Sequence, residues 1–138
     1  MHRTFLILGA ISALIGVAVG AFGAHGLEAR LATDSLAVYE TGVRYQLIHA
    51  ISLLFIGLAA DRWPVAGWGR AGWMFVAGTV LFSGSLYALA LTGVRALGVV
   101  TPVGGVCFLL GWAFAILAGT RSGRAEDGDD QTRGLRGR

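Results

Sequence analysis

The stretch TFLILGAISALIGVAVGAFGA, residues 4–24, decides the fold of this chain. It carries no charged side chain, and a helix of about 20 residues, rising 1.5 Å per residue, crosses the roughly 30 Å hydrocarbon core of a bilayer. Three similar stretches follow at residues 43–60, 71–91 and 101–119. The sequence therefore predicts an all-α polytopic membrane four-helix bundle, with residues 1–120 forming one transmembrane domain.

The composition places the chain in the lipid bilayer. Hydrophobic residues make up 55% of its 138 residues and charged residues only 14%, with a mean hydropathy of +0.68, whereas soluble domains carry about 25% charge. The eleven basic residues are all arginines, at the ends of the apolar stretches or in the C-terminal tail. This distribution is typical of charge that orients membrane helices, so we expect the lipid bilayer as a partner and no nucleic acid.

The arginines also predict the orientation. Basic residues are retained on the cytoplasmic side of inserted helices. A cytoplasmic N-terminus puts Arg3, Arg62, Arg70, Arg121 and Arg124 on that side, against Arg30, Arg44 and Arg95 outside. We therefore expect a multi-pass protein of the cytoplasmic (inner) membrane with both termini cytoplasmic.

Two segments outside the spans have compositions of their own. Within residues 25–42, Leu27/Leu31 and Leu36/Tyr39 recur at helical spacing, which predicts a short interfacial helix between spans 1 and 2. The last segment, residues 121–138, mixes acidic residues with arginine and has almost no apolar side chain. Because it has nothing to bury that would offset the entropy of ordering, we expect a disordered cytoplasmic tail.

Small residues recur on one face of the first and last spans. Gly16 and Gly20 form a GxxxG pair in the first, and Gly104 and Gly111 lie on one side of the fourth. In lipid, small residues let two helix backbones approach closely. The pattern predicts helix-packing seams, and it leaves open whether they join helices of one chain or chains of a homo-oligomer or larger membrane complex.

Polar side chains gather on one side of the second and third spans. Residues three and four apart share a helix face, and alternating spans bring these faces to the same depth near the outer end of the first span. The candidate polar cluster in the outer half of the membrane is His25, Tyr45, Gln46, His49, Ser83 and Tyr87.

Two interpretations of the cluster remain open. Ionisable residues inside a membrane are costly and often mark the path of a solute or proton, which would make the cluster an outward-facing pocket. Alternatively, its members form hydrogen bonds that fix which helix faces which, at about 0.6 kcal/mol per bond. In both cases we expect His49 to face the interior and to bond His25, Ser83 or Tyr87.

Nothing in the sequence indicates catalysis or a cofactor. His25 and His49, without a cysteine or carboxylate at ligand spacing, are too few ligands for zinc. The run Ser83-Gly84-Ser85 is not a GxSxG elbow, and no acidic residue lies within a span to orient a histidine. We expect a protein that is not an enzyme and that holds no metal or cofactor.

Four segments, in this order, resemble those of a known family. They are GAFGAHGL at 20–27, TGVRYQLIHA at 41–50, FSGSLY at 82–87, and TPVGG at 101–105 followed by Gly111-Trp112. Over about residues 1–120 the chain is similar to the small four-span membrane proteins of the domain of unknown function 423 family, related to the transmembrane protein 256 family. The resemblance implies a four-helix integral membrane protein with no established activity.

Two hypotheses for its role follow. One is a structural or accessory membrane subunit without enzymatic activity; the other is a small carrier or binding site for a proton or small polar solute. A carrier needs a cavity around His49 that a ligand can reach, whereas an accessory subunit needs only a dry, hydrogen-bonded core.

Overall fold

The computed structural model describes the backbone of residues 2–136 and the side chains of residues 2–123. Within that range every element is helical. In chain order the elements are α1 (His2–Phe22), the π-helix η1 (Gly23–Leu27), α2 (Thr33–Arg62), α3 (Ala66–Gly78), the π-helix η2 (Thr79–Ser83), α4 (Gly84–Thr92), the 3₁₀-helix η3 (Arg95–Val99) and α5 (Thr101–Arg136).

Four stretches of the described chain are helical, long and apolar enough to cross a membrane. They are His2–Leu27, Thr33–Arg62, Ala66–Thr92 and Arg95–Gly123. The π-helix η1 continues α1, and η2 joins α3 to α4 without a break. The prediction of an all-α fold with four long apolar helices is confirmed, and each helical stretch extends beyond the apolar core from which it was predicted.

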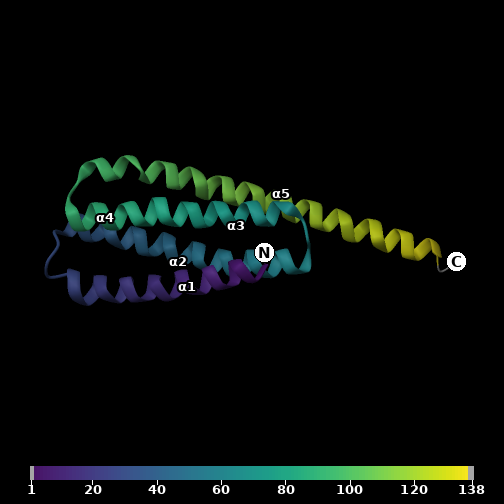
Figure 1. Cartoon of the computed structure of the whole chain (residues 1–138), viewed down its shortest axis with the longest axis horizontal. Coiled ribbons are helices and arrows are strands. Elements are labelled where there is room, and N and C mark those ends of the chain that lie inside the picture. The colour runs from purple at the N-terminus through teal and green to yellow at the C-terminus, as the bar shows by residue number, and fades with distance from the viewer. Residues whose placement is uncertain (1, 137–138) are drawn as a thin grey trace.

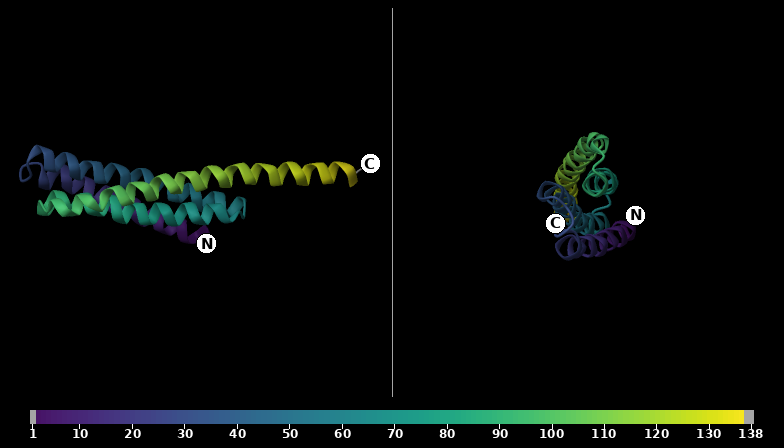
Figure 2. Two further views of the ribbon diagram at one scale, coloured as in Figure 1. Left: turned by 90° about the horizontal axis from the view of Figure 1, so that it is seen from above. Right: turned by 90° about the vertical axis from the view of Figure 1, so that its left-hand side faces the viewer.

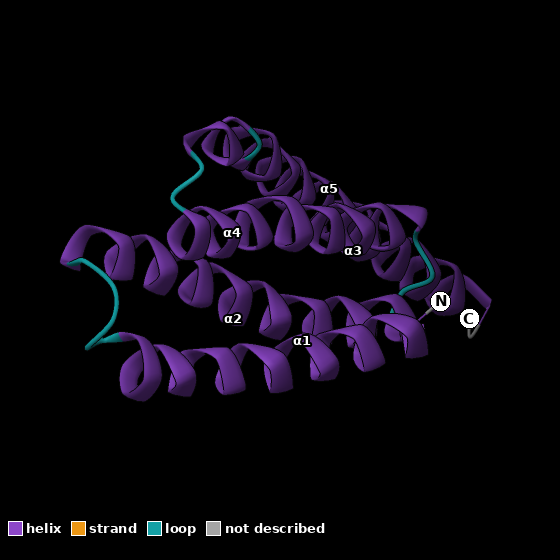
Figure 3. Ribbon diagram, turned by 60° about the vertical axis from the view of Figure 1, so that its left-hand side comes forward, coloured by secondary structure: helices purple, strands orange, loops and turns teal. Residues whose placement is uncertain are grey.

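The spans lie side by side, each running opposite to the one before it. α1 packs along α2, α2 packs along α3, η2 and α4, and α5 covers α3 and η2 from the far side (Figures 1 and 3). The N-terminus and the C-terminal part of α5 lie toward one end of the molecule. The connections at 28–32 and 93–100 lie at the other end (Figure 1). α5 extends well beyond the other helices (Figure 2).

The predicted interfacial helix between the first two spans is wrong. Leu27 closes η1, and Tyr39 lies near the start of the 30-residue helix α2. Both side chains are buried and pack with Ala90 of α4 in one hydrophobic cluster. The helical spacing of apolar residues in 25–42 therefore belongs to two spans that extend toward their connection, because these side chains are covered by protein and not by the membrane interface.

The main hydrophobic core joins all four spans. Phe5 of α1, Leu53 of α2, Phe75 of α3 and Phe108 of α5 are each almost fully buried in it. Large apolar side chains also cover the outside of the molecule, as at Leu14, which is 72% exposed. An apolar exterior of this kind is what a bilayer solvates.

Glycines of the predicted seam on α1 bring that helix close to α2. A Cβ atom on Gly16 would lie 2.7 Å from the Leu47 side chain, and one on Gly20 would lie 3.1 Å from Val43. Real Cβ atoms essentially never approach within 3.0 Å of another heavy atom. A side chain at Gly16 would therefore have to displace the end of the Leu47 side chain, and glycine lets α1 lie against α2 without that shift.

The glycines of the seam on α5 also contact helices of the same chain. A Cβ atom on Gly111 would lie 2.6 Å from the ring of Phe75, and one on Gly104 would overlap the backbone of Phe82 in η2. Phe82 cannot relieve this overlap by changing its side-chain rotamer, because the overlapping atoms belong to its main chain. Gly104 thus sets the distance between α5 and η2.

α5 remains packed beyond the predicted domain boundary at residue 120. The indole N–H of Trp68 donates to Ser122 Oγ over 3.3 Å, and Ser122 is 4% exposed. The helical backbone of α5 continues to Arg136, whereas the side chains after Gly123 lie outside the described residues. The disorder expected for residues 121–138 stays a prediction.

Candidate functional site

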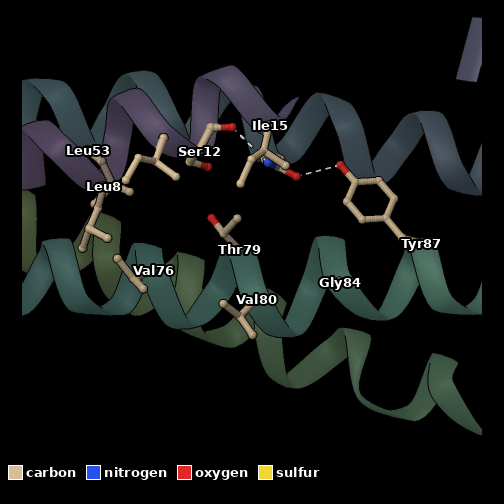
Figure 4. A pocket seen from close by; sticks show the side chains of 11 residues that line it. Leu8, Ser12, Ile15, Leu53, Val76, Thr79, Val80, Gly84 and Tyr87 are labelled. Atoms are coloured by element: carbon tan, nitrogen blue, oxygen red, sulfur yellow. Dashed lines mark hydrogen bonds between the residues drawn. The ribbon is translucent and has the colours of Figure 1, made fainter. Parts of the chain in front are cut away.

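A chain of hydrogen bonds joins three spans. The Tyr87 hydroxyl of α4 donates to Gln46 Oε1 of α2 over 2.8 Å, and Gln46 Nε2 donates to the carbonyl oxygen of Ser12 in α1 over 2.9 Å (Figure 4). Gln46 is only 5% exposed. Both ends of its amide have partners, which offsets most of the cost of placing an amide in an apolar medium.

Gly42 makes this chain of hydrogen bonds possible. It lies one turn before Gln46 on α2, and a Cβ atom there would come within 2.8 Å of the Tyr87 ring. Any larger residue would push the ring away from α2. The local sequence of α2 therefore places the hydroxyl of Tyr87 within reach of the Gln46 amide.

A cavity of about 340 Å³ lies beside these hydrogen bonds. α1 and α2 line one side of it, and α3, η2 and α4 line the other (Figure 4). Its lining carries no charged side chain and is mostly apolar, with polar groups from four residues. The lining residues are Leu8, Ile11, Ser12, Ile15, Gln46, Leu53, Val76, Thr79, Val80, Gly84 and Tyr87.

His49 is buried away from this cavity, which its side chain does not line. It is 3% exposed, so the prediction that it faces the interior is confirmed. Its Nδ1 atom lies 2.8 Å from the Tyr45 carbonyl oxygen. Because a carbonyl oxygen only accepts, Nδ1 carries the proton and Nε2 is left as an acceptor. Nε2 is buried and has no hydrogen-bond partner among the described residues, so the predicted bond from His49 to another span is wrong.

Aromatic rings surround His49 where polar partners were expected. The imidazole stacks on Phe108 of α5 with ring centroids 3.5 Å apart and planes at 9°. Phe75 of α3 lies 5.2 Å away, and the rings of Tyr45 and Trp112 each lie 6.2 Å away. Three helices thus build a cage of aromatic faces, which packs against a neutral imidazole and would attract a cationic one.

The candidate polar cluster divides around α2. Gln46 and Tyr87 meet beside the cavity, whereas Tyr45 and His49 stack on the side that faces α5. Tyr45 and Gln46 are consecutive residues and therefore point about 100° apart on a helix. This divergence separates two groups that the shared three- and four-residue spacing had placed together.

The two remaining members of the cluster join neither group by a hydrogen bond. Ser83 is 1% exposed, and its Oγ atom has no partner among the described residues. His25 is exposed in η1, at the end of the first span, whereas His49 lies near the middle of α2. Across the described part of the chain, no three His, Cys, Asp or Glu side chains lie close enough to hold a metal ion.

Ser12 and Gly84 belong to the cavity but were not predicted as site residues. Ser12 is the only polar residue between Phe5 and Ala24, and its position among small residues indicated helix packing instead. Its Oγ atom is buried without a partner in the described chain. The isolated hydroxyl in an apolar span was the feature of the sequence that could have identified Ser12 as a site residue. The sequence contains no comparable feature for Gly84, because it does not show which residues lie opposite a glycine.

Comparisons with known proteins agree on the type of protein. The family model described as "Protein of unknown function (DUF423)" matches residues 19–105. The chain is 46% identical over 122 residues to the UPF0382 membrane protein YwdK of Bacillus subtilis, which covers 86% of this chain and 98% of the relative. It is 47% identical over 117 residues to the UPF0382 membrane protein SERP0230 of Staphylococcus epidermidis, with 84% and 94% covered. No solved structure matches the chain.

Proposed function

This chain belongs to the DUF423 family and is a multi-pass membrane protein, and we propose that it serves as a structural or accessory membrane subunit without enzymatic activity. We place it in the cytoplasmic membrane with both termini cytoplasmic. The N-terminus and the C-terminal part of α5 lie at the same end of the molecule, and this end carries the larger number of arginines near the spans. The retention of basic residues on the cytoplasmic side supports this orientation.

The hydrogen-bonded chain from Tyr87 through Gln46 to Ser12 carries the proposal of a structural role. It ties α4, α2 and α1 together inside hydrocarbon, where apolar surface gains little from pairing. Hydrogen bonds between membrane helices contribute about 0.6 kcal/mol on average. Their larger effect is on specificity, because a helix register that left the amide without partners would cost several times that amount.

The surroundings of His49 support the same role. A carrier needs space next to its ionisable group, and here Phe75 and Phe108 fill that space. The separate cavity is lined mostly by apolar side chains, which makes it a poor site for a small polar solute. A dry interior held by internal hydrogen bonds is what a structural subunit requires.

Reconstitution and crosslinking test the accessory role together. We expect phosphatidylcholine vesicles that hold the purified full-length chain to show no more solute or proton flux than protein-free vesicles. We expect crosslinking in native membranes to recover a membrane protein at a fixed ratio to this chain, identified by mass spectrometry. Solute flux through the purified chain, or a chain that crosslinks only to itself, would contradict the accessory role.

The unpartnered Nε2 atom of His49 favours a second candidate function, the handling of a proton inside the membrane. In vesicles with a trapped pH-sensitive dye and an imposed potential, this function predicts proton flux with the wild-type chain. The variant His49→Phe keeps an aromatic ring in the stack but cannot take up a proton, so it should abolish the flux. Equal acidification of wild-type, variant and protein-free vesicles would exclude this candidate.

A further inference from the structure

We propose that the cavity between α1 and the η2–α4 segment is a binding site for a neutral, bilayer-dissolved lipid with an apolar body that ends in a group with a carbonyl or hydroxyl oxygen. This site goes beyond the structural role proposed above and does not depend on it.

The mouth of the cavity opens toward the hydrocarbon of the bilayer. Ile11 and Ile15 of α1 and Val80 of η2 line it and are 47%, 48% and 66% exposed. On a membrane span, such apolar exposure faces lipid. A ligand would therefore enter sideways from the bilayer, and it would have to dissolve there first.

Three of the four polar residues that line the cavity lie near the middle of their spans. Thr79 is the central residue of the span Ala66–Thr92, and Ser12 and Gln46 lie within three residues of the centres of their own spans. The hydrocarbon core extends about 15 Å to either side of that level. A phospholipid keeps its headgroup at the surface, so only its acyl chains reach this depth. These side chains can therefore bind only a lipid whose neutral polar group enters the interior of the bilayer.

The polar residues that line the cavity offer hydrogen-bonding capacity without charge. The Oγ atom of Ser12 has no partner in the described chain and almost no accessible surface, so a ligand oxygen would reach it only after the side chain turned further toward the cavity. Its hydroxyl can donate as well as accept. Beside it, Gln46 Nε2 carries two N–H donors, and one of them bonds the Ser12 carbonyl oxygen. Because no lining residue is charged, the complementary group is a neutral acceptor, either a carbonyl or a hydroxyl oxygen.

Gly84 leaves open space in the wall of the cavity. A Cβ atom there would have no heavy atom within 4 Å, in contrast to Gly42 and Gly104, where helix packing requires glycine. Glycine inside a helix costs roughly 1 kcal/mol relative to alanine, and protein packing does not explain it at this position. Gly84 also follows the π-helix η2 directly, and π-helical turns occur frequently at functional sites.

The volume is compatible with one such ligand. Cavities that bind small molecules measure about 300–1,000 Å³ and are mostly apolar, with a few polar groups that fix orientation. At about 340 Å³ this cavity is at the lower end of that range. It holds the polar end of the lipid and the first part of its apolar body, and the remainder lies among the acyl chains.

Photolabelling of the full-length chain in phosphatidylcholine nanodiscs tests the site. The probe is farnesol that carries a diazirine, and the competitor is decylbenzoquinone, so that a hydroxyl and a carbonyl are both examined. We expect labelling of Ile11, Ile15 or Val80, located by mass spectrometry and displaced by the quinone. The saturated hydrocarbon farnesane, which has no polar group, should compete at least about tenfold less well.

Two variants of the cavity and one control sharpen the test. Gly84→Leu fills the open space and should lower labelling by about tenfold or more, whereas Ala113→Leu, which adds the same side chain on the exposed face of α5, should leave it unchanged. Ser12→Ala removes the unpartnered hydroxyl and should weaken competition by decylbenzoquinone about fivefold. If Gly84→Leu fails to fold, Ser12→Ala still tests whether the lipid binds in this cavity.

Three outcomes would overturn the proposal. Equal labelling by a phosphatidylcholine with a diazirine in its acyl chain, unaffected by the quinone, would show that ordinary acyl chains fill the cavity. A shift in oligomeric state of Gly84→Leu, measured by sedimentation in detergent, would show that a second copy of the chain covers it. Farnesol labelling that is unchanged in Gly84→Leu and in Ser12→Ala would place the probe elsewhere.

Discussion

The imidazole of His49 lies flat on the phenyl ring of Phe108, with the ring centroids 3.5 Å apart. This contact joins the middle of α2 to α5, a helix whose main neighbours are α3 and η2. It also leaves the Nε2 atom of His49 buried and without a partner in the described chain. The stack thus combines a favourable aromatic contact with an unsatisfied acceptor, and the two effects can be separated by substitution.

We predict that His49→Phe is as stable as the wild-type chain or more stable. The phenyl ring keeps the stack on Phe108, and removing a buried acceptor without a partner relieves a cost of about 1–3 kcal/mol. His49→Ala, which loses the ring contacts and leaves a space, should lower stability by a few kcal/mol. Thermal unfolding in detergent, followed by circular dichroism, measures both. A large loss of stability in His49→Phe would mean that Nε2 has a partner supplied from outside the chain.

Neighbouring glycines on α5 should respond oppositely to alanine. Gly104→Ala places a methyl group against the backbone of Phe82, so we expect a loss of about 1–3 kcal/mol from overpacking. Gly105→Ala is the matched control, because its Cβ atom would meet Phe82 at an ordinary 3.8 Å, and it should be neutral or slightly stabilising. The free energy of unfolding of each variant in mixed micelles decides the point. If Gly104→Ala changed the oligomeric state while its stability was unaltered, the seam would lie between chains.

The orientation predicts which engineered cysteines react from outside. In a chain without Cys107, Asp34→Cys lies beside the 28–32 connection and should react with a membrane-impermeant maleimide on intact cells. Asp61→Cys, whose position is also exposed, lies at the opposite end and should react only after permeabilisation. The reverse pattern would place both termini outside.

The length of α5 that stabilises the fold should end near Ser122. We expect a chain truncated after Gly123 to keep the melting temperature of the full-length protein. The deleted residues 124–138 have almost no apolar side chain to bury. Truncation after Gly119 removes Ser122, the acceptor of the Trp68 indole N–H. It should lower the melting temperature by several degrees, since a buried indole donor is left without a partner. Equal melting temperatures for the two truncations would contradict this boundary.

The candidate site was predictable only in part. The burial of His49 followed from an ionisable group in a span, and polar faces at similar depth placed Gln46 and Tyr87 in one cluster. The sequence did not indicate that these two would bond each other, because the interhelical bond was expected from His49. The separation of Tyr45 from Gln46 did not follow, because helical spacing gives the face of a residue only to within a quarter turn or so. The partner of a given face depends on which helix lies against it.

The sequence by itself determined that this chain crosses the membrane with four helices. That result needs only the length of each apolar stretch and the cost of exposing backbone polar groups to hydrocarbon, both of which are properties of single segments. The recurrence of small residues also indicated where a helix backbone can be approached closely, as at Gly104.

Only the tertiary structure decided what lies opposite each of these faces. The same rule for small residues applies to Gly104 and Gly84, yet the first meets the backbone of Phe82 and the second meets open space. Likewise, the extension of α2 toward Thr33 depended on the burial of Tyr39 against other spans. Contacts between helices are set by the packing of whole surfaces at once, so no single segment of the sequence contains them.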